Sequence, residues 1–202
     1  YNQIIKKDCT ISLQAESTEQ VVLMIGQSTI PYGHKDDLPL RLLGIHLGSG
    51  MSSLLFRKFR EDYGVAYDVG AHHASREGPS PFLIHISTSQ EKSLLTLKLL
   101  HETWEQLSET LLSNQELELA RGKFRGQIAH NSQTVSQRAE RKAQLYSLGL
   151  SEYYDFESTK EIESITSRDI QKVARKYLKN PLLSLCGPEE TIKKLASNWK
   201  EY

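Results

Sequence analysis

Apolar residues in the first third of the chain repeat at every second position and later at every third or fourth position. Residues 10–15 alternate with period two and residues 21–26 form a short β-branched run, which predicts two strands. After Asp37 the spacing becomes helical and predicts two helices, with a turn at residues 48–50 between them and an end at Gly64. Their inward positions are Leu38, Leu42 and Ile45 in the first helix and Met51, Leu54, Leu55 and Phe59 in the second.

The period returns to two after Gly64. Residues 65–75 predict a long strand, and residues 82–87 alternate as a second strand. The turn-forming residues 77–80 lie between them. This arrangement predicts an antiparallel hairpin.

Two capping boxes predict long helices in the second half of the chain. Residues 88–91 and residues 113–116 both fit the pattern, and the second helix is predicted to run to about Leu148. Residues 152–158 are the least regular segment and predict a loop. The first of these helices has a predicted inward face made by Leu97, Leu100, Trp104, Leu107 and Leu111.

The C-terminal part predicts a helix, a strand and a last helix. The first helix starts near Thr166, the strand covers residues 182–186, and Pro188 opens the terminal helix. Inward residues of the first of these helices are Ile170, Val173, Ala174, Tyr177 and Leu178. Because strands and helices do not alternate strictly, we expect an α+β fold with a mainly antiparallel sheet covered by long helices.

Composition narrows the functional classes. The 202 residues contain 25 Lys+Arg and 25 Asp+Glu, which fits one domain and offers no basic excess for nucleic acid. No apolar run approaches membrane-spanning length, so we expect a soluble protein without a membrane partner. Cys9 and Cys186 lack Cys-x-x-Cys spacing and predict buried reduced thiols, as in the cytoplasm or another reducing compartment. The missing initiator Met suggests a piece of a longer chain.

The usual catalytic motifs are missing from the sequence. His72 and His73 are adjacent on a predicted strand and therefore point to opposite faces, and His101-Glu102 has no second His at metal spacing. No Ser lies in Gly-x-Ser-x-Gly context. Residues 48–50 are not followed by Lys-Ser or Lys-Thr, which favours a helix–helix turn over a phosphate loop. We therefore expect no metal and no cofactor on this chain.

Arg60 and Tyr67 are the strongest candidate functional residues. Arg60 falls in the last turn of a predicted helix and Tyr67 begins the next strand, so the turn at Gly64 brings a guanidinium and a phenol towards one place. Paired donors are what an oxyanion or a peptide carbonyl requires. The structural alternative is that Arg60 pairs with a surface carboxylate and that Tyr67 is an amphipathic residue of the sheet.

The order of motifs around these two residues resembles a known family. A Gly-rich turn, Ser-x-Leu-Phe, Arg-Glu and Gly-x-Ala-Tyr follow one another at residues 48–50, 53–56, 60–61 and 64–67. The likeness extends to Gly26, Pro31, residues 117–123 and residues 185–188. This order of motifs is similar to that of the C-terminal domain in the pitrilysin/insulinase family of zinc peptidases, and most of all to that of the mitochondrial-processing-peptidase-like branch.

The resemblance implies that residues 1–202 are one zinc-free C-terminal domain and a fragment of a longer two-domain endopeptidase. The zinc site, an inverted His-x-x-Glu-His helix, would belong to an N-terminal domain of the same chain or a separate subunit, in a homo- or heterodimer. Arg60 and Tyr67 would reach the scissile carbonyl of an extended peptide, and the segment alone would be inactive. Two departures, Tyr63 and Val65, remove no donor, and the Gly-rich turn is too short for a presequence-guiding loop.

Two other functional classes stay open. The chain can belong to a catalytically silent partner or scaffold subunit of the same family, which would leave the donor pair without a catalytic role. An unrelated α+β binding module would make the order of motifs a coincidence. Arg60 and Tyr67 favour a domain that takes part in catalysis.

Overall fold

The computed structural model describes residues 10–74 and 76–200. These residues form a five-stranded sheet with the order β1-β5-β2-β4-β3. The β1–β5 pair is parallel and the other pairs are antiparallel. The strands are β1 (Ile11–Ala15), β2 (Gln20–Ser28), β3 (Asp68–His73), β4 (Pro81–Ser89) and β5 (Leu182–Gly187).

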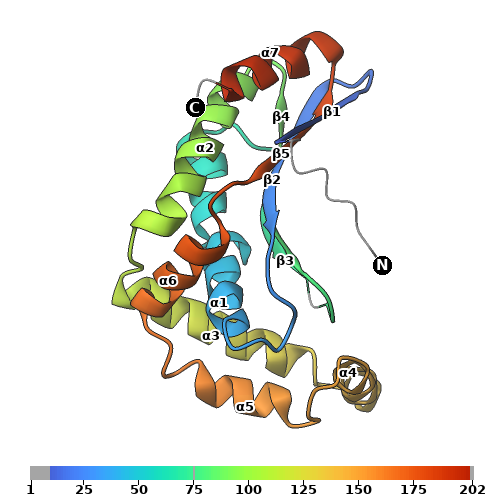
Figure 1. Ribbon diagram of the computed structural model, residues 1–202, viewed down its shortest axis with the longest axis vertical. Coiled ribbons are helices and arrows are strands. Elements are labelled where there is room, and N and C mark those ends of the chain that lie inside the picture. The colour runs from blue at the N-terminus through green and yellow to red at the C-terminus, as the bar shows by residue number, and fades with distance from the viewer. Residues whose placement is uncertain (1–9, 75, 201–202) are drawn as a thin grey trace.

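Helices cover one face of the sheet, with α1, α2 and α6 lying alongside each other on that face (Figure 1). The helices are α1 (Asp37–Gly48), the π-helix η1 (Phe56–Asp62), α2 (Ser93–Glu109), α3 (Asn114–His130), α4 (Val135–Ser147), α5 (Tyr154–Glu161), α6 (Ser167–Tyr177) and α7 (Glu189–Trp199). The α+β class and the mainly antiparallel sheet are therefore confirmed. Among the residues described, no helix is both long and apolar enough to cross a membrane.

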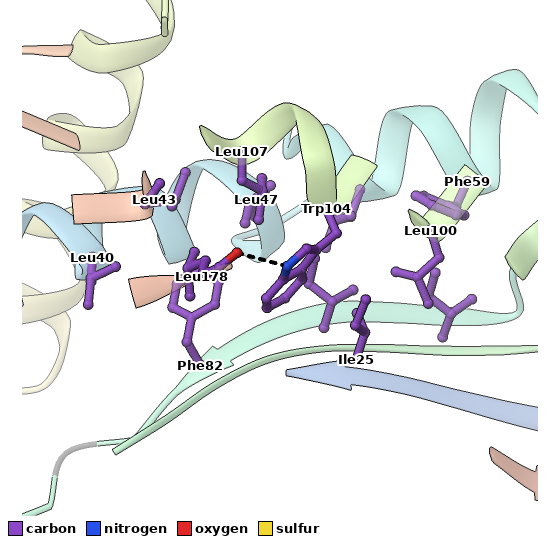
Figure 2. Close-up of a cluster of buried hydrophobic side chains, with 14 of the residues drawn as sticks. Ile25, Leu40, Leu43, Leu47, Phe59, Phe82, Leu100, Trp104, Leu107 and Leu178 are labelled. Atoms are coloured by element: carbon purple, nitrogen blue, oxygen red, sulfur yellow. Dashed lines mark hydrogen bonds between the residues drawn. The ribbon is translucent and has the colours of Figure 1, made fainter. Parts of the chain in front are cut away.

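The core lies between the sheet and these helices. Alternate residues of β2 and β4 are buried towards the helices, as the period of two predicts. Trp104 of α2 enters this layer, where its indole Nε1 donates to the Leu178 carbonyl at 3.1 Å and its ring meets Phe82 edge to face (Figure 2). The buried residues of the two strands are Val21, Leu23 and Ile25 in β2 and Phe82, Ile84, Ile86 and Thr88 in β4.

The capping box predicted at residues 88–91 is wrong. Thr88 is a buried residue of β4, and its hydroxyl donates to the Val65 carbonyl at 2.6 Å. Helix α2 begins only at Ser93 and has no side-chain cap. Because α2 also ends at Glu109, Leu111 lies beyond it and is exposed.

The helix predicted from residue 113 to Leu148 is two helices, α3 and α4. Its predicted capping box at Ser113 and Glu116 is confirmed, but a second box at Thr134 and Gln137 opens α4. The loop predicted at residues 152–158 is also wrong, because α5 starts at Tyr154 within it. The helix predicted to start near Thr166 is confirmed, and a capping box between Thr166 and Asp169 opens it.

Other boundaries are shorter than predicted. The strand predicted over residues 65–75 is regular only in β3, and the second predicted helix is largely the π-helix η1. Gly48 is the last residue of α1, and Ser49 is fixed against α3 because its carbonyl accepts from Lys123 at 2.5 Å. Cys186 is only partly buried because it lies on the uncovered face of β5, and Cys9 lies outside the described residues.

Candidate functional site

The segment from η1 to β3 is held in a tight turn by main-chain hydrogen bonds. Gly64 has a φ of +57°, which side-chain-bearing residues rarely adopt. The amides of Val65 and Ala66 both donate to the Phe59 carbonyl, at 2.8 and 3.1 Å. Lys92, which directly precedes α2, donates from its Nζ to the Gly64 carbonyl at 2.8 Å. The turn therefore has a defined shape supported from three sides.

This turn brings Arg60 and Tyr67 together. Arg60 Nη1 lies 3.5 Å from the main-chain carbonyl of Tyr67, to which it donates a hydrogen bond. The Arg60 guanidinium also lies over the Phe56 ring, 5.2 Å from its centroid. Tyr67 is 61% exposed. The structure thus places the two residues beside each other, with the phenol on the surface.

The surface ion pair considered as an alternative for Arg60 is not found within the described residues, where the partners of Arg60 are the Tyr67 carbonyl and the Phe56 ring. An exposed guanidinium and an exposed phenol on one turn are donors for a carbonyl oxygen that gains negative charge. That chemistry needs a second surface to bring the substrate, since the turn itself is open to solvent. The donor role of Arg60 and Tyr67 stays a prediction.

The described residues do not fit a zinc site. His73 is buried with 4% of its side chain exposed, whereas His72 lies on the opposite, exposed side of β3, as the strand period predicts. Over residues 10–74 and 76–200, no group of three His, Cys, Asp or Glu side chains could hold a metal ion. No catalytic step is therefore assigned to a metal held by this chain.

A buried polar cluster beneath α1 was not predicted from the sequence. Asp37 is fully buried, with its Oδ1 3.8 Å from Nδ1 of His73 and its Oδ2 3.7 Å from Nη1 of Arg41. Tyr154 of α5 donates to Asp37 Oδ2 at 3.4 Å. Burial raises the pKa of Asp37, and burial together with the Arg41 charge lowers the pKa of His73 to about 4.

The cluster escaped the sequence analysis because its members come from α1, β3 and α5. Asp37 was interpreted only as the residue where a helix begins, and nothing in its local pattern indicates burial. The only sequence feature that points to this cluster is the position of His73 on the inward face of a predicted strand. That signal predicts a buried imidazole but not its partners.

Comparison with known proteins supports the resemblance. Residues 3–124 match the family model described as the peptidase M16 inactive domain. An uncharacterized zinc protease of Rickettsia felis is 29% identical over 175 residues, which cover 85% of this chain and 42% of that protein. The uncharacterized zinc protease YmxG of Bacillus subtilis is 29% identical over 126 residues, covering 62% of this chain and 31% of its own.

Solved structures share the fold. A peptidase M16 inactive domain from Pseudomonas fluorescens superimposes with a TM-score of 0.80 at 21% identity, over 88% of this chain and 43% of the other. A protease from Helicobacter pylori gives a TM-score of 0.78 at 17% identity, over 88% and 44%. The chain spans less than half the length of these two zinc proteases and of these two solved structures, and the processing-peptidase-like branch stays a prediction. With the family model matching more than half of its residues, the chain belongs to the peptidase M16 inactive-domain family.

Proposed function

We propose that residues 1–202 are the zinc-free C-terminal domain of a zinc endopeptidase, and that Arg60 and Tyr67 donate to the scissile carbonyl of an extended peptide. The observation that carries this proposal is the turn at Gly64, which sets the Arg60 guanidinium 3.5 Å from the Tyr67 carbonyl and leaves the phenol exposed. Zinc would be bound by an N-terminal domain of the same longer chain or by a separate subunit. The domain alone would be inactive, since two donors without a nucleophile cannot hydrolyse a peptide.

The local architecture supports a positioning role for the turn. Phe56 lies one helical turn before Arg60 and packs on its guanidinium, which limits the freedom of a long side chain. Lys92 and Thr88 fix the carbonyls of Gly64 and Val65. Donors that are already fixed need little rearrangement when charge develops on a carbonyl oxygen.

Substitution in the full-length protein tests the donor roles. Arg60→Ala and Tyr67→Phe each remove one donor and should lower kcat/KM for peptide cleavage at least tenfold, because a single oxyanion donor typically contributes about 2 to 4 kcal/mol. Zinc content should stay unchanged. The measurement is cleavage of a fluorogenic peptide, with metal analysis of the same samples.

The same segment offers matched controls. Arg57→Ala removes another exposed arginine of η1, and Tyr63→Phe removes another exposed phenol hydroxyl close to the turn. Both controls should cleave as the native protein does. Equal rates in Arg60→Ala, Tyr67→Phe and the controls would refute the donor assignment and favour the scaffold or partner-subunit alternative.

A further inference from the structure

A cavity of about 570 Å³ lies between α1, α3, α4 and α5, away from the turn at Gly64. Its walls include Tyr32, Arg41, Phe124 and Gln127. Arg41 and Gln127 also line a second cavity of about 490 Å³, which extends along β3. None of the residues lining either cavity belongs to residues 56–67. The cavity is therefore a separate candidate site.

Arg41 is held in place by aromatic rings and not by hydrogen bonds. Its guanidinium lies 4.7 Å from the ring centroids of both Tyr32 and Phe124. Its side chain is only 16% exposed, and within the described part of the chain no acceptor receives a hydrogen bond from it. Asp37, at 3.7 Å from Nη1, compensates part of the charge without a directed bond. Nη1 is buried beside Asp37, so Nε and Nη2 are the donors of this fixed guanidinium that a ligand in the cavity can reach.

The other basic residue of the cavity lining, Arg141, differs from Arg41 because an acidic partner occupies its donors. Arg141 of α4 is neutralised by Asp155, to which Nε and Nη2 donate at 2.7 and 2.6 Å, and it also donates to the Tyr32 hydroxyl. Glu140 adds a negative charge to the lining. Arg41 is therefore the lining cation, among the residues described, that still has donors to offer. A second full negative charge on a ligand would meet Glu140.

We propose that this cavity binds a carboxylate group of a peptide and that Arg41 is its receptor. A planar guanidinium matches a carboxylate through two parallel hydrogen bonds. The charge of Glu140 disfavours a dianionic phosphate, whereas the side-chain amides of Gln127 and Asn131 suit the polar backbone of a peptide. The carboxylate can be the C-terminus of the peptide or an acidic side chain.

The choice of a peptide rests on the proposed function, but the site does not use Arg60 or Tyr67. Binding is measured by calorimetry on the full-length protein after zinc is removed with a chelator, so that no peptide is cleaved. Three acetylated tripeptides are compared at up to about 10 mM, a range that detects millimolar affinity. One has neutral side chains and a free C-terminus, one has an aspartate and an amidated C-terminus, and one has neither carboxylate.

We expect one of the two carboxylate peptides to bind at least tenfold more tightly than the neutral peptide, and which one binds identifies the source. Arg41→Gln should abolish this preference. Arg138→Gln is the matched control, because Arg138 is an exposed arginine of α4 outside the cavity lining and should not matter. Equal binding of all three peptides, absence of binding, or an unchanged preference in Arg41→Gln would overturn the proposal.

Arg41→Lys covers the case in which Arg41→Gln does not fold. Lysine keeps the charge beside Asp37 but loses the planar pair of donors, so the carboxylate peptide should bind several-fold more weakly. Native affinity in Arg41→Lys would also overturn the proposal. The double variant Arg60→Ala, Tyr67→Phe should keep the native preference for the carboxylate peptide over the neutral peptide, because Arg41 sets that preference. That result separates the cavity from the donor pair, so either proposal can fail alone.

Discussion

The close approach of α1 to β3 gives a sharp prediction at Gly48. A Cβ atom placed on Gly48 would lie 2.4 Å from the amide nitrogen of Ala71 and 3.0 Å from its Cβ. Gly44, one turn earlier in the same helix, offers the matched case, because its Cβ would meet the Phe82 ring at 3.7 Å, an ordinary contact. The same substitution, glycine to alanine, should therefore have opposite effects at the two positions.

The magnitudes follow from the geometry. Gly44→Ala should raise the free energy of unfolding by up to about 1 kcal/mol, because the helix propensity of alanine exceeds that of glycine by about this amount in the interior of a helix. In Gly48→Ala the new methyl group overlaps with backbone, which cannot rotate away, so the end of α1 must move off β3. Overpacking of this kind costs about 1 to 3 kcal/mol. We expect the two variants to differ by about 2 kcal/mol or more.

Urea unfolding followed by far-UV circular dichroism measures both variants against the native protein. The urea concentration at the midpoint of unfolding should be highest for Gly44→Ala, intermediate for the native protein and lowest for Gly48→Ala. If Gly48→Ala is as stable as Gly44→Ala, α1 does not pack on β3 as closely as described. A lowered midpoint in Gly44→Ala would show that the space beside Phe82 is smaller than described.

Three further predictions concern the core, the buried histidine and zinc. Trp104→Ala should lower the free energy of unfolding by about 3 to 5 kcal/mol in the same urea assay, because Trp104 is buried. The control Leu95→Ala, at an exposed position of α2, should change the free energy of unfolding little. A near-neutral effect of Trp104→Ala would show that the buried face of α2 is misassigned. The pKa of His73 is about 4 in the fold and 6.5 ordinarily, so stability should fall by up to about 3 kcal/mol as pH drops through this window. His73→Gln should show a smaller loss, and equal pH profiles would contradict the buried neutral imidazole. Residues 1–202 alone should retain no stoichiometric zinc after dialysis, which elemental analysis can contradict.

Local sequence signals predicted the elements that depend on neighbouring residues. The capping box predicted at Ser113 succeeds because both of its partners lie within one turn of the helix that they open. The same pattern fails at Thr88, where pairing of β4 with β2 and a hydrogen bond to the Val65 carbonyl decide the conformation. Residues 131–134 end α3 without Gly or Pro, but Thr134 and Gln137 have the spacing of a capping box, so the start of α4 carried a local signal that the prediction of one continuous helix overlooked.

The two candidate sites also differ in whether they depend on residues close together or far apart in the sequence. Arg60 and Tyr67 are seven residues apart on either side of one turn, so their proximity could be predicted from the sequence. Arg41 is enclosed by Tyr32 and by Phe124 of α3, and the cavity beside it also needs α4 and α5. Long-range packing of this kind leaves no local pattern. The cavity could be found only in the structure.

The central claim is that this chain is the donor half of a zinc peptidase. The most direct measurement is to sequence the parent gene upstream of the codon for Tyr1 and translate about 200 residues, a typical domain length. We expect a second, similar domain that carries His-x-x-Glu-His. An upstream domain without that motif would contradict a single-chain enzyme and make the parent a partner or scaffold subunit.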